Sequence, residues 1–214
     1  MGLSVLILGE SGSGKSASLR NFKKSDVLVF SLHKSRLPFK TDINLINMAN
    51  MAYSERYEVI KAKIRKYQDK VKTFIIDDSD YLMFFEQQQR NKEGGYQKYT
   101  EIALHMIDLK NYVETLNDDV IVYFLNHIET DKDSNKIRAI TAGKMIDTQL
   151  GTFEALFENV LLCDVIDGKH VFITQSNGTN TAKTSMGMFE SEEIDNDLKF
   201  VDETIREYYN LSKK

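Results

Sequence analysis

The sequence has little of several features that would restrict its class. Among 214 residues it holds one cysteine, Cys163, and one proline, Pro38. A single cysteine excludes an intramolecular disulfide, and no Cys/His spacing is typical of a zinc site. No apolar run approaches the ~20 residues of a membrane-spanning helix. The start of the chain has no basic region before its apolar stretch, so it does not resemble a secretory signal. We expect a cytoplasmic protein with no membrane partner.

An excess of basic charge is also missing. Lysine and arginine total 28 and aspartate and glutamate total 32, so the formal net charge is −4. Such a chain does not coat bare nucleic acid through bulk charge alone, although a local basic groove, or one formed on assembly, stays open. Because there is no repeat and no recognisable linker, residues 1–214 are expected to form one domain.

Apolar runs and helical periodicities alternate along the first two thirds of the chain. Continuous apolar runs predict buried strands over residues 3–8, 27–30, 73–76 and 120–125. A short helix is expected over 15–23, and apolar steps of three and four predict longer helices over 57–71 and 102–116. This alternation predicts an α/β fold with three layers, in which helices cover both faces of a mostly parallel sheet.

The last third of the sequence changes to antiparallel patterns. Residues 127–141 hold polar turn residues between two short extended runs and predict a hairpin. A second hairpin is predicted over 159–174, where Asp167-Gly168 suits a tight primed turn. We therefore expect antiparallel strands at the C-terminal edge of the sheet, followed by an amphipathic helix over 198–208.

Residues 9–16 read GESGSGKS and match G-x-x-x-x-G-K-[ST], the Walker A phosphate-binding loop, or P-loop. The loop follows a predicted buried strand and opens a predicted helix, as the motif requires. Its glycines permit tight conformations in which successive N–H groups converge on phosphates. Lys15 would bridge the β- and γ-phosphates, and the Ser16 hydroxyl would bind Mg²⁺. The residues expected to hold ATP are Gly9, Glu10, Ser11, Gly12, Ser13, Gly14, Lys15, Ser16 and Ala17.

A strand that ends in carboxylates supplies the second part of the predicted site. Residues 73–80 read TFIIDDSD, an apolar run followed by acids, which is the Walker B pattern. Two assignments are open, because the metal residue is Asp77 if the first acid serves it and Asp78 if the Asp-Ser pair is aligned as in recombinases. We favour Asp77 for Mg²⁺ and Asp78 as the base or water-orienting group. Asp80 is expected to be a helix N-cap.

The predicted strand over 120–125 ends in two polar residues, Asn126 and His127. In P-loop ATPases a polar group at this strand tip senses the γ-phosphate, and either residue could hydrogen-bond the attacking water. Polar residues that simply leave a strand are an equal interpretation. Cys163 lies in an apolar run and is expected in the core. Three other histidines without partners at metal-ligand spacing are expected to be structural or exposed: His33, His105 and His170.

Two polar segments, residues 141–144 and 177–184, follow the two predicted hairpins and carry one lysine each. Either could reach the nucleotide of a neighbouring subunit or contact DNA phosphates. A solvated loop is nevertheless the usual structure of such a segment, and we expect one here.

Together these segments resemble phage-encoded ATP-binding proteins of the RecA-like superfamily, some of which are grouped with single-strand annealing and recombination ATPases. The segments that carry the resemblance are residues 5–16, 77–79, 124–128 and 179–189. The resemblance implies a RecA-like core, ATP and Mg²⁺ binding, and work on single-stranded DNA in phage recombination or replication, in the host cytoplasm. By position, Asn126 would match the polar sensor, and Lys183 the lysine that reaches a neighbour's ATP in a homo-oligomer.

The sequence departs from the recombinase pattern at two places. The phosphate loop begins at residue 9, so we expect no N-terminal domain or polymerisation segment ahead of it. Ser31-Leu32-His33 stands where a catalytic glutamate would follow the second strand. Neither filament formation nor fast hydrolysis is therefore implied.

Three function classes compete on the sequence. The resemblance favours a Mg²⁺-dependent ATPase that acts on single-stranded DNA. A nucleotide or small-molecule kinase also needs a P-loop, but the arginines here are few and scattered rather than gathered in a lid. A nucleotide-gated interaction module would suit an acidic chain without an evident catalytic glutamate. A GTPase is disfavoured, because no Asp-x-x-Gly follows the third strand and no Asn-Lys-x-Asp follows the fourth.

Overall fold

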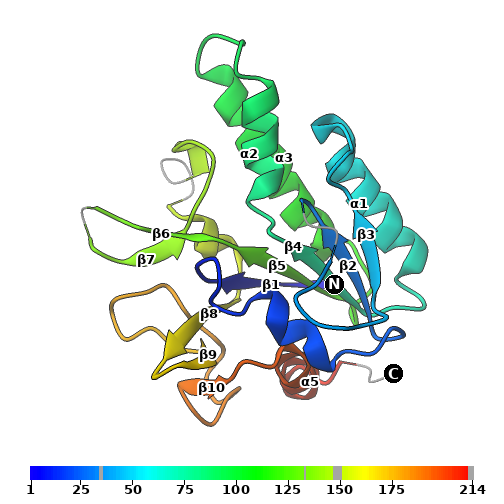
Figure 1. Cartoon of the computed structure of the whole chain (residues 1–214), viewed down its shortest axis with the longest axis vertical. Coiled ribbons are helices and arrows are strands. Elements are labelled where there is room, and N and C mark those ends of the chain that lie inside the picture. The colour runs from blue at the N-terminus through cyan, green and yellow to red at the C-terminus, as the bar shows by residue number, and fades with distance from the viewer. Residues whose placement is uncertain (34–35, 133, 147–150, 212–214) are drawn as a thin grey trace.

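The computed structural model describes residues 1–33, 36–132, 134–146 and 151–211, and its centre is one eight-stranded sheet (Figure 1). The strand order is β10-β9-β8-β1-β5-β4-β2-β3. The strands are β1 (Leu3–Leu8), β2 (Val27–Ser31), β3 (Asn44–Asn47), β4 (Thr73–Asp77), β5 (Ile121–Asn126), β8 (Asn159–Ile166), β9 (Lys169–Ile173) and β10 (Glu193–Asp195). Every pairing from β8 to β3 is parallel, and β9 and β10 add antiparallel strands. The predicted sheet is confirmed.

The sheet order decides where the loops at the strand ends meet. Strand β5 lies between β1, which leads into the phosphate loop, and β4, which ends in the acidic residues. In register, Leu8 lies opposite Asn126, and Ser31 lies opposite Asp77. Because these strands are parallel, their carboxyl ends form one edge, where ligands of open α/β sheets bind.

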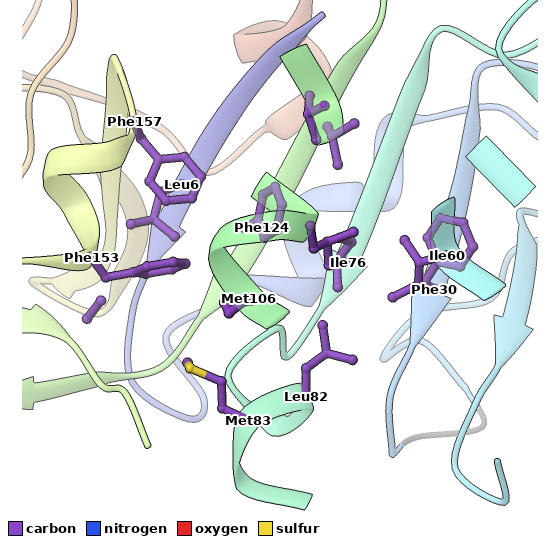
Figure 2. Packing of buried hydrophobic residues seen from close by; sticks show 14 of the residues in the cluster. Leu6, Phe30, Ile60, Ile76, Leu82, Met83, Met106, Phe124, Phe153 and Phe157 are labelled. Carbon is purple, nitrogen blue, oxygen red and sulfur yellow. The ribbon is translucent and has the colours of Figure 1, made fainter. Parts of the chain in front are cut away.

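Helices cover both faces of the sheet. One face packs against α1 (Tyr53–Tyr67), α2 (Tyr81–Gln89) and α3 (Gln97–Glu114). Figure 2 shows this cluster, in which strand residues such as Leu6 and Phe124 meet Leu82 and Met106 from the helices. The other face packs against the 3₁₀ helix Ser16–Asn21 and α5 (Leu198–Tyr208). None of the helices in the described part of the chain is long and apolar enough to span a membrane.

Helix α5 is fixed to the sheet by a buried polar network. The Asp202 carboxylate accepts hydrogen bonds from the hydroxyls of Thr73 (3.0 Å) and Tyr123 (3.2 Å) and from Arg206 Nε (2.8 Å). Arg206 also donates to the backbone carbonyl of Asp119 at 2.7 Å. Burial raises the pKa of Tyr123 well above its usual value. A buried ion pair is tolerated only when its remaining donors and acceptors are satisfied in this way.

Several predicted elements differ in detail from the structure. The helices predicted over 57–71 and 102–116 are α1 over Tyr53–Tyr67 and α3 over Gln97–Glu114, so each begins and ends earlier. The helix after the phosphate loop is a 3₁₀ helix over Ser16–Asn21 rather than a helix over 15–23. Its Ser18 hydroxyl donates to the Lys15 carbonyl at 2.6 Å, a local bond that competes with regular α-helical pairing. The first predicted hairpin, β6 (Ile128–Thr130) and β7 (Ile137–Ala139), forms a two-stranded sheet of its own instead of joining the main sheet.

The second hairpin has its predicted turn residues, and the closing helix has an N-cap. Asp167 and Gly168 connect β8 to β9 with φ angles of 50° and 76°, the positive values that a primed turn requires. Asp197 caps α5, and its side chain accepts from the backbone N–H groups of Lys199 and Phe200.

The segment 177–184 is exposed at residues 177–179, as expected of a solvated loop, but residues 180–184 are packed against the protein, and there the expectation was wrong. Lys183 exchanges two backbone hydrogen bonds with Val160 of β8, at 2.8 and 2.7 Å. The carbonyl of Thr179 accepts from the backbone N–H of Ile137 in β7 at 2.8 Å. Ala182 is only 2% exposed. The backbone pairs with two neighbouring strands, which the polar side chains of the segment do not reveal.

Candidate active site

A cavity of about 330 Å³ lies at the phosphate loop, on the carboxyl edge of the sheet. The predicted residues that line it are Glu10, Ser11, Gly12, Gly14, Lys15, Ser16, Ala17 and Asp78. Gly9 and Ser13, also predicted, support the loop from within the protein, where the Ser13 carbonyl accepts a hydrogen bond from the Cys163 thiol at 3.2 Å. The structure thus brings most of the predicted phosphate-binding residues to one hollow.

Glycines allow the loop to fold tightly. A Cβ atom on Gly9 would lie 2.5 Å from Ser13 Oγ and 2.7 Å from the Cys163 carbonyl oxygen, so no larger residue fits. Gly14 has a φ of +108°, which L side chains rarely adopt. The spacing of the motif therefore follows from backbone geometry as well as from phosphate binding.

Lys15 is folded back onto its own loop. Its Nζ donates to the carbonyls of Gly9 at 2.7 Å and Glu10 at 3.0 Å. Burial lowers the pKa of Lys15, and nearby carboxylates, Asp78 first among them, oppose this shift. The ammonium group would have to exchange these carbonyls for phosphate oxygens when a nucleotide binds.

Ser16 and Asp77 meet across the sheet edge. The Ser16 hydroxyl donates to Asp77 Oδ1 at 2.9 Å, and Asp77 is 1% exposed. A hydroxyl and a carboxylate fit Mg²⁺, which takes one or two protein oxygens and completes its shell with water and phosphate oxygens. Within the described residues, no group of three or more His, Cys, Asp or Glu side chains is placed to hold a metal ion.

Asp78 follows directly and has an uncommon backbone. Its φ is +61°, in the left-handed region, which costs a non-glycine residue about 1–3 kcal/mol but suits Asp and Asn better than most. Its carboxylate lies between two imidazoles, 3.3 Å from His33 Nδ1 and 3.7 Å from His127 Nε2. His33, expected to be structural or exposed, is therefore a neighbour of the predicted base.

Asp80 occupies the predicted N-cap position of α2, but its side chain makes no capping hydrogen bond. Its carboxylate instead accepts from the backbone N–H of His127 at 3.1 Å and from His127 Nδ1 at 3.1 Å. The side chain of Asp80 thus ties the start of α2 to the end of β5.

Comparison with known proteins decides the family. A family model described as "AAA domain" matches residues 1–186. The chain belongs to the AAA domain family. This is a family of P-loop ATPases, as the loop and the acidic strand end predicted. The narrower resemblance, to phage-encoded recombination ATPases, is not addressed by this match and stays a prediction.

Among solved structures, the AAA domain is similar to "a prototypical ATPase from the type III secretion system of pathogenic bacteria". The two share 13% identity with a TM-score of 0.50, and the match covers 76% of this chain and 51% of the other, about half its length. At this identity the likeness shows the fold alone, and it confirms the RecA-like fold. No curated protein matches the sequence.

Two predicted catalytic residues of the AAA domain do not line the cavity. Asn126 is fully buried, where its amide accepts from the Ser79 hydroxyl at 3.1 Å and donates to the carbonyls of His127 (2.8 Å) and Ile140 (3.1 Å). Its neighbour His127 lines the cavity instead. Lys183 is also absent from the lining. Any contact between Lys183 and ATP would therefore have to be with ATP bound to another subunit.

Three cavity residues carried no recognisable signal in the sequence: Arg36, Pro38 and His170. His170, on β9, approaches the phosphate loop with its Nδ1 2.7 Å from the Ser13 carbonyl oxygen. Cys163 Sγ donates to the same oxygen, and burial raises the pKa of this thiol to about 11. The antiparallel edge hairpin therefore supports the loop, a contact that only the folded chain creates.

Proposed function

We propose that this AAA domain hydrolyses the β–γ phosphate bond of ATP in the cavity at the phosphate loop, with Mg²⁺ held by Ser16 and Asp77. The proposal is supported most directly by the 2.9 Å contact between the Ser16 hydroxyl and the Asp77 carboxylate, beside the loop that carries Lys15. Ser16 and Asp77 are 61 positions apart in the sequence, and the fold brings their side chains into one hydrogen bond.

The residues divide the chemistry among them. The loop N–H groups and Lys15 bind the phosphates and offset their charge. Bound Mg²⁺ would neutralise the charge that develops on the β- and γ-oxygens. Asp78 accepts a proton from water while the water oxygen attacks the γ-phosphorus, and the bond to the bridging oxygen breaks, releasing ADP. His127, rather than the buried Asn126, is the strand-tip residue that faces this water.

Single-stranded DNA is the polymer that we propose this ATPase acts on, as a homo-oligomer. Support comes from the family resemblance and from the hairpin β6–β7, which begins one residue after His127 and carries the exposed lysines Lys132 and Lys136. The lysine-bearing segment 177–184 packs against the same hairpin. In a chain with a net charge of −4, DNA phosphates would have to be contacted by individual exposed lysines such as these, because residues 128–139 hold three acidic and three basic side chains.

The test is ATP hydrolysis with Mg²⁺, with and without single-stranded DNA, using Lys15→Ala as the blank. We expect turnover above the blank, stimulation by DNA, and loss of the stimulation in a Lys132→Ala/Lys136→Ala double variant. A matched double variant on α1, Lys63→Ala/Lys66→Ala, should be stimulated like the wild type.

Other outcomes would favour the competing functions. Turnover that is slow and indifferent to DNA would favour a nucleotide-gated interaction module. Transfer of the γ-phosphate to an added acceptor would identify a kinase. The structure gives the kinase little support, because the described lining of the cavity holds one arginine, Arg36, rather than an arginine-rich lid.

A further inference from the structure

Three neighbouring strands bring an acid and two imidazoles together at the edge of the sheet. Strand β4 lies between β5 and β2, and the residues just past their ends are Asp78, His127 and His33. His33 Nδ1 lies 3.3 Å from Asp78 Oδ2, and His127 Nε2 lies 3.7 Å from Asp78 Oδ1. Each carboxylate oxygen therefore has one imidazole beside it. The side chain of Asp78 is 3% exposed.

His127 is fixed from its other side by Asp80. Asp80 accepts from both the backbone N–H and the Nδ1 of His127, each at 3.1 Å. A carboxylate only accepts, so Nδ1 carries the hydrogen and Nε2 is the nitrogen that faces Asp78. The orientation of this ring is set by two contacts from one side chain.

His33 is held by an aromatic ring. Tyr81, the first residue of α2, stacks on His33 with ring centroids 4.7 Å apart and an interplanar angle of 28°. The same tyrosine presents its edge to His127 at 5.7 Å and 86°, and it is backed by Phe85 at 5.1 Å. Although its side chain is 38% exposed, His33 thus has a defined plane, with Nδ1 toward Asp78.

We propose that His33 is a positioning residue that orients the Asp78 carboxylate for taking a proton from the attacking water, an inference that rests on the ATP hydrolysis proposed above. The contact of His33 Nδ1 with Oδ2, at 3.3 Å, would hold one carboxylate oxygen in place and leave the Oδ1 side toward His127, which lines the cavity with Asp78. A base that is held in the productive orientation raises the reaction rate, and small displacements of catalytic groups lower that rate by large factors.

Two substitutions separate the effect of the Nδ1 contact with Asp78 from the effect of the ring stacking on Tyr81. His33→Phe keeps a ring on Tyr81 but removes the donor, whereas His33→Asn places an amide N–H where Nδ1 stands and removes the ring. We expect His33→Phe to lower kcat roughly 10- to 100-fold with KM for ATP unchanged within about twofold. His33→Asn should retain most of the wild-type kcat. His105→Phe, at a histidine that contacts Glu86 on α2, is the matched control and should leave kcat unchanged.

A double variant tests whether His33 acts through Asp78. In an Asp78→Asn background, His33→Phe should cause no further loss of kcat, and thermal unfolding should show both single variants folded. Wild-type kcat in His33→Phe, equal losses in the Phe and Asn variants, or full additivity with Asp78→Asn would each overturn the positioning role. Wild-type turnover no higher than the Lys15→Ala blank would instead overturn the proposed function, and the positioning role with it.

Discussion

The backbone at residue 78 restricts which side chains can stand there. With φ at +61°, Asn and Gly fit the turn, whereas alanine or the longer glutamate would add strain. This accounts for a short acid at the position of the proposed base. It also makes asparagine the substitution that removes the base without disturbing the turn.

Asp78→Asn should therefore bind ATP with wild-type affinity but lose turnover by about 10²- to 10⁴-fold, the usual contribution of a general base. Calorimetric titration with a non-hydrolysable ATP analogue and a steady-state phosphate-release assay measure the two effects. Lys15→Ala is the contrasting variant, which should lose affinity itself. Normal hydrolysis by Asp78→Asn would show that another group activates the water.

At the scale of elements, the packing of α5 on the sheet depends on the buried ion pair between Asp202 and Arg206. Arg206→Ala would leave the buried Asp202 carboxylate without its partner, and we expect a loss of about 3–5 kcal/mol in the free energy of unfolding. Urea titration followed by circular dichroism measures this loss. Lys199→Ala, which removes half-buried ion pairs with Asp26 and Glu203 and a contact with the Phe22 ring, should cost less than about 1 kcal/mol. Equal costs for the two variants would contradict the structure.

The edge hairpin β8–β9 offers a second test through Cys163. Burial raises the pKa of this thiol from 9.0 to about 11, so the folded state holds the proton more tightly. The associated stability is present below pH 9 and is lost as the pH rises toward 11. At pH 8 we expect iodoacetamide to label the folded protein at least about 100-fold more slowly than the denatured chain, because the thiolate reacts. Equal labelling rates would mean that β8 does not cover the thiol.

Elements with a strong hydrophobic pattern in the sequence were predictable. Elements whose position depends on contacts with neighbouring elements were not. The apolar run of β1 gave its correct bounds, because both faces of that strand are buried. Strand β3 is only half-buried at an edge, and α2 is short, so neither had a clear periodicity. The phosphate loop was predictable because its residues are consecutive. His33 and His170 reach the site only through strand pairing, which leaves no local trace in the sequence.

At the scale of the whole molecule, Lys183 can be tested as a contact between subunits. Its backbone forms two hydrogen bonds with Val160, and its side chain is not among the residues that line the cavity of its own chain. If an oligomer places Lys183 at a neighbour's ATP, specific activity should rise with protein concentration, and Lys183→Ala should abolish that rise. Sedimentation with an ATP analogue would confirm that the variant still assembles. Unchanged concentration dependence in Lys183→Ala would exclude this contact.

The junction between β5 and β6 has a mechanical consequence. His127 is the one residue between the two strands, so the imidazole beside Asp78 and the base of the β6–β7 hairpin belong to the same stretch of backbone. Figure 1 shows the hairpin projecting well beyond the main sheet. A displacement of the hairpin would therefore be transmitted through one residue to the imidazole beside Asp78, the acid that we propose activates water, without any contact between the hairpin and the nucleotide.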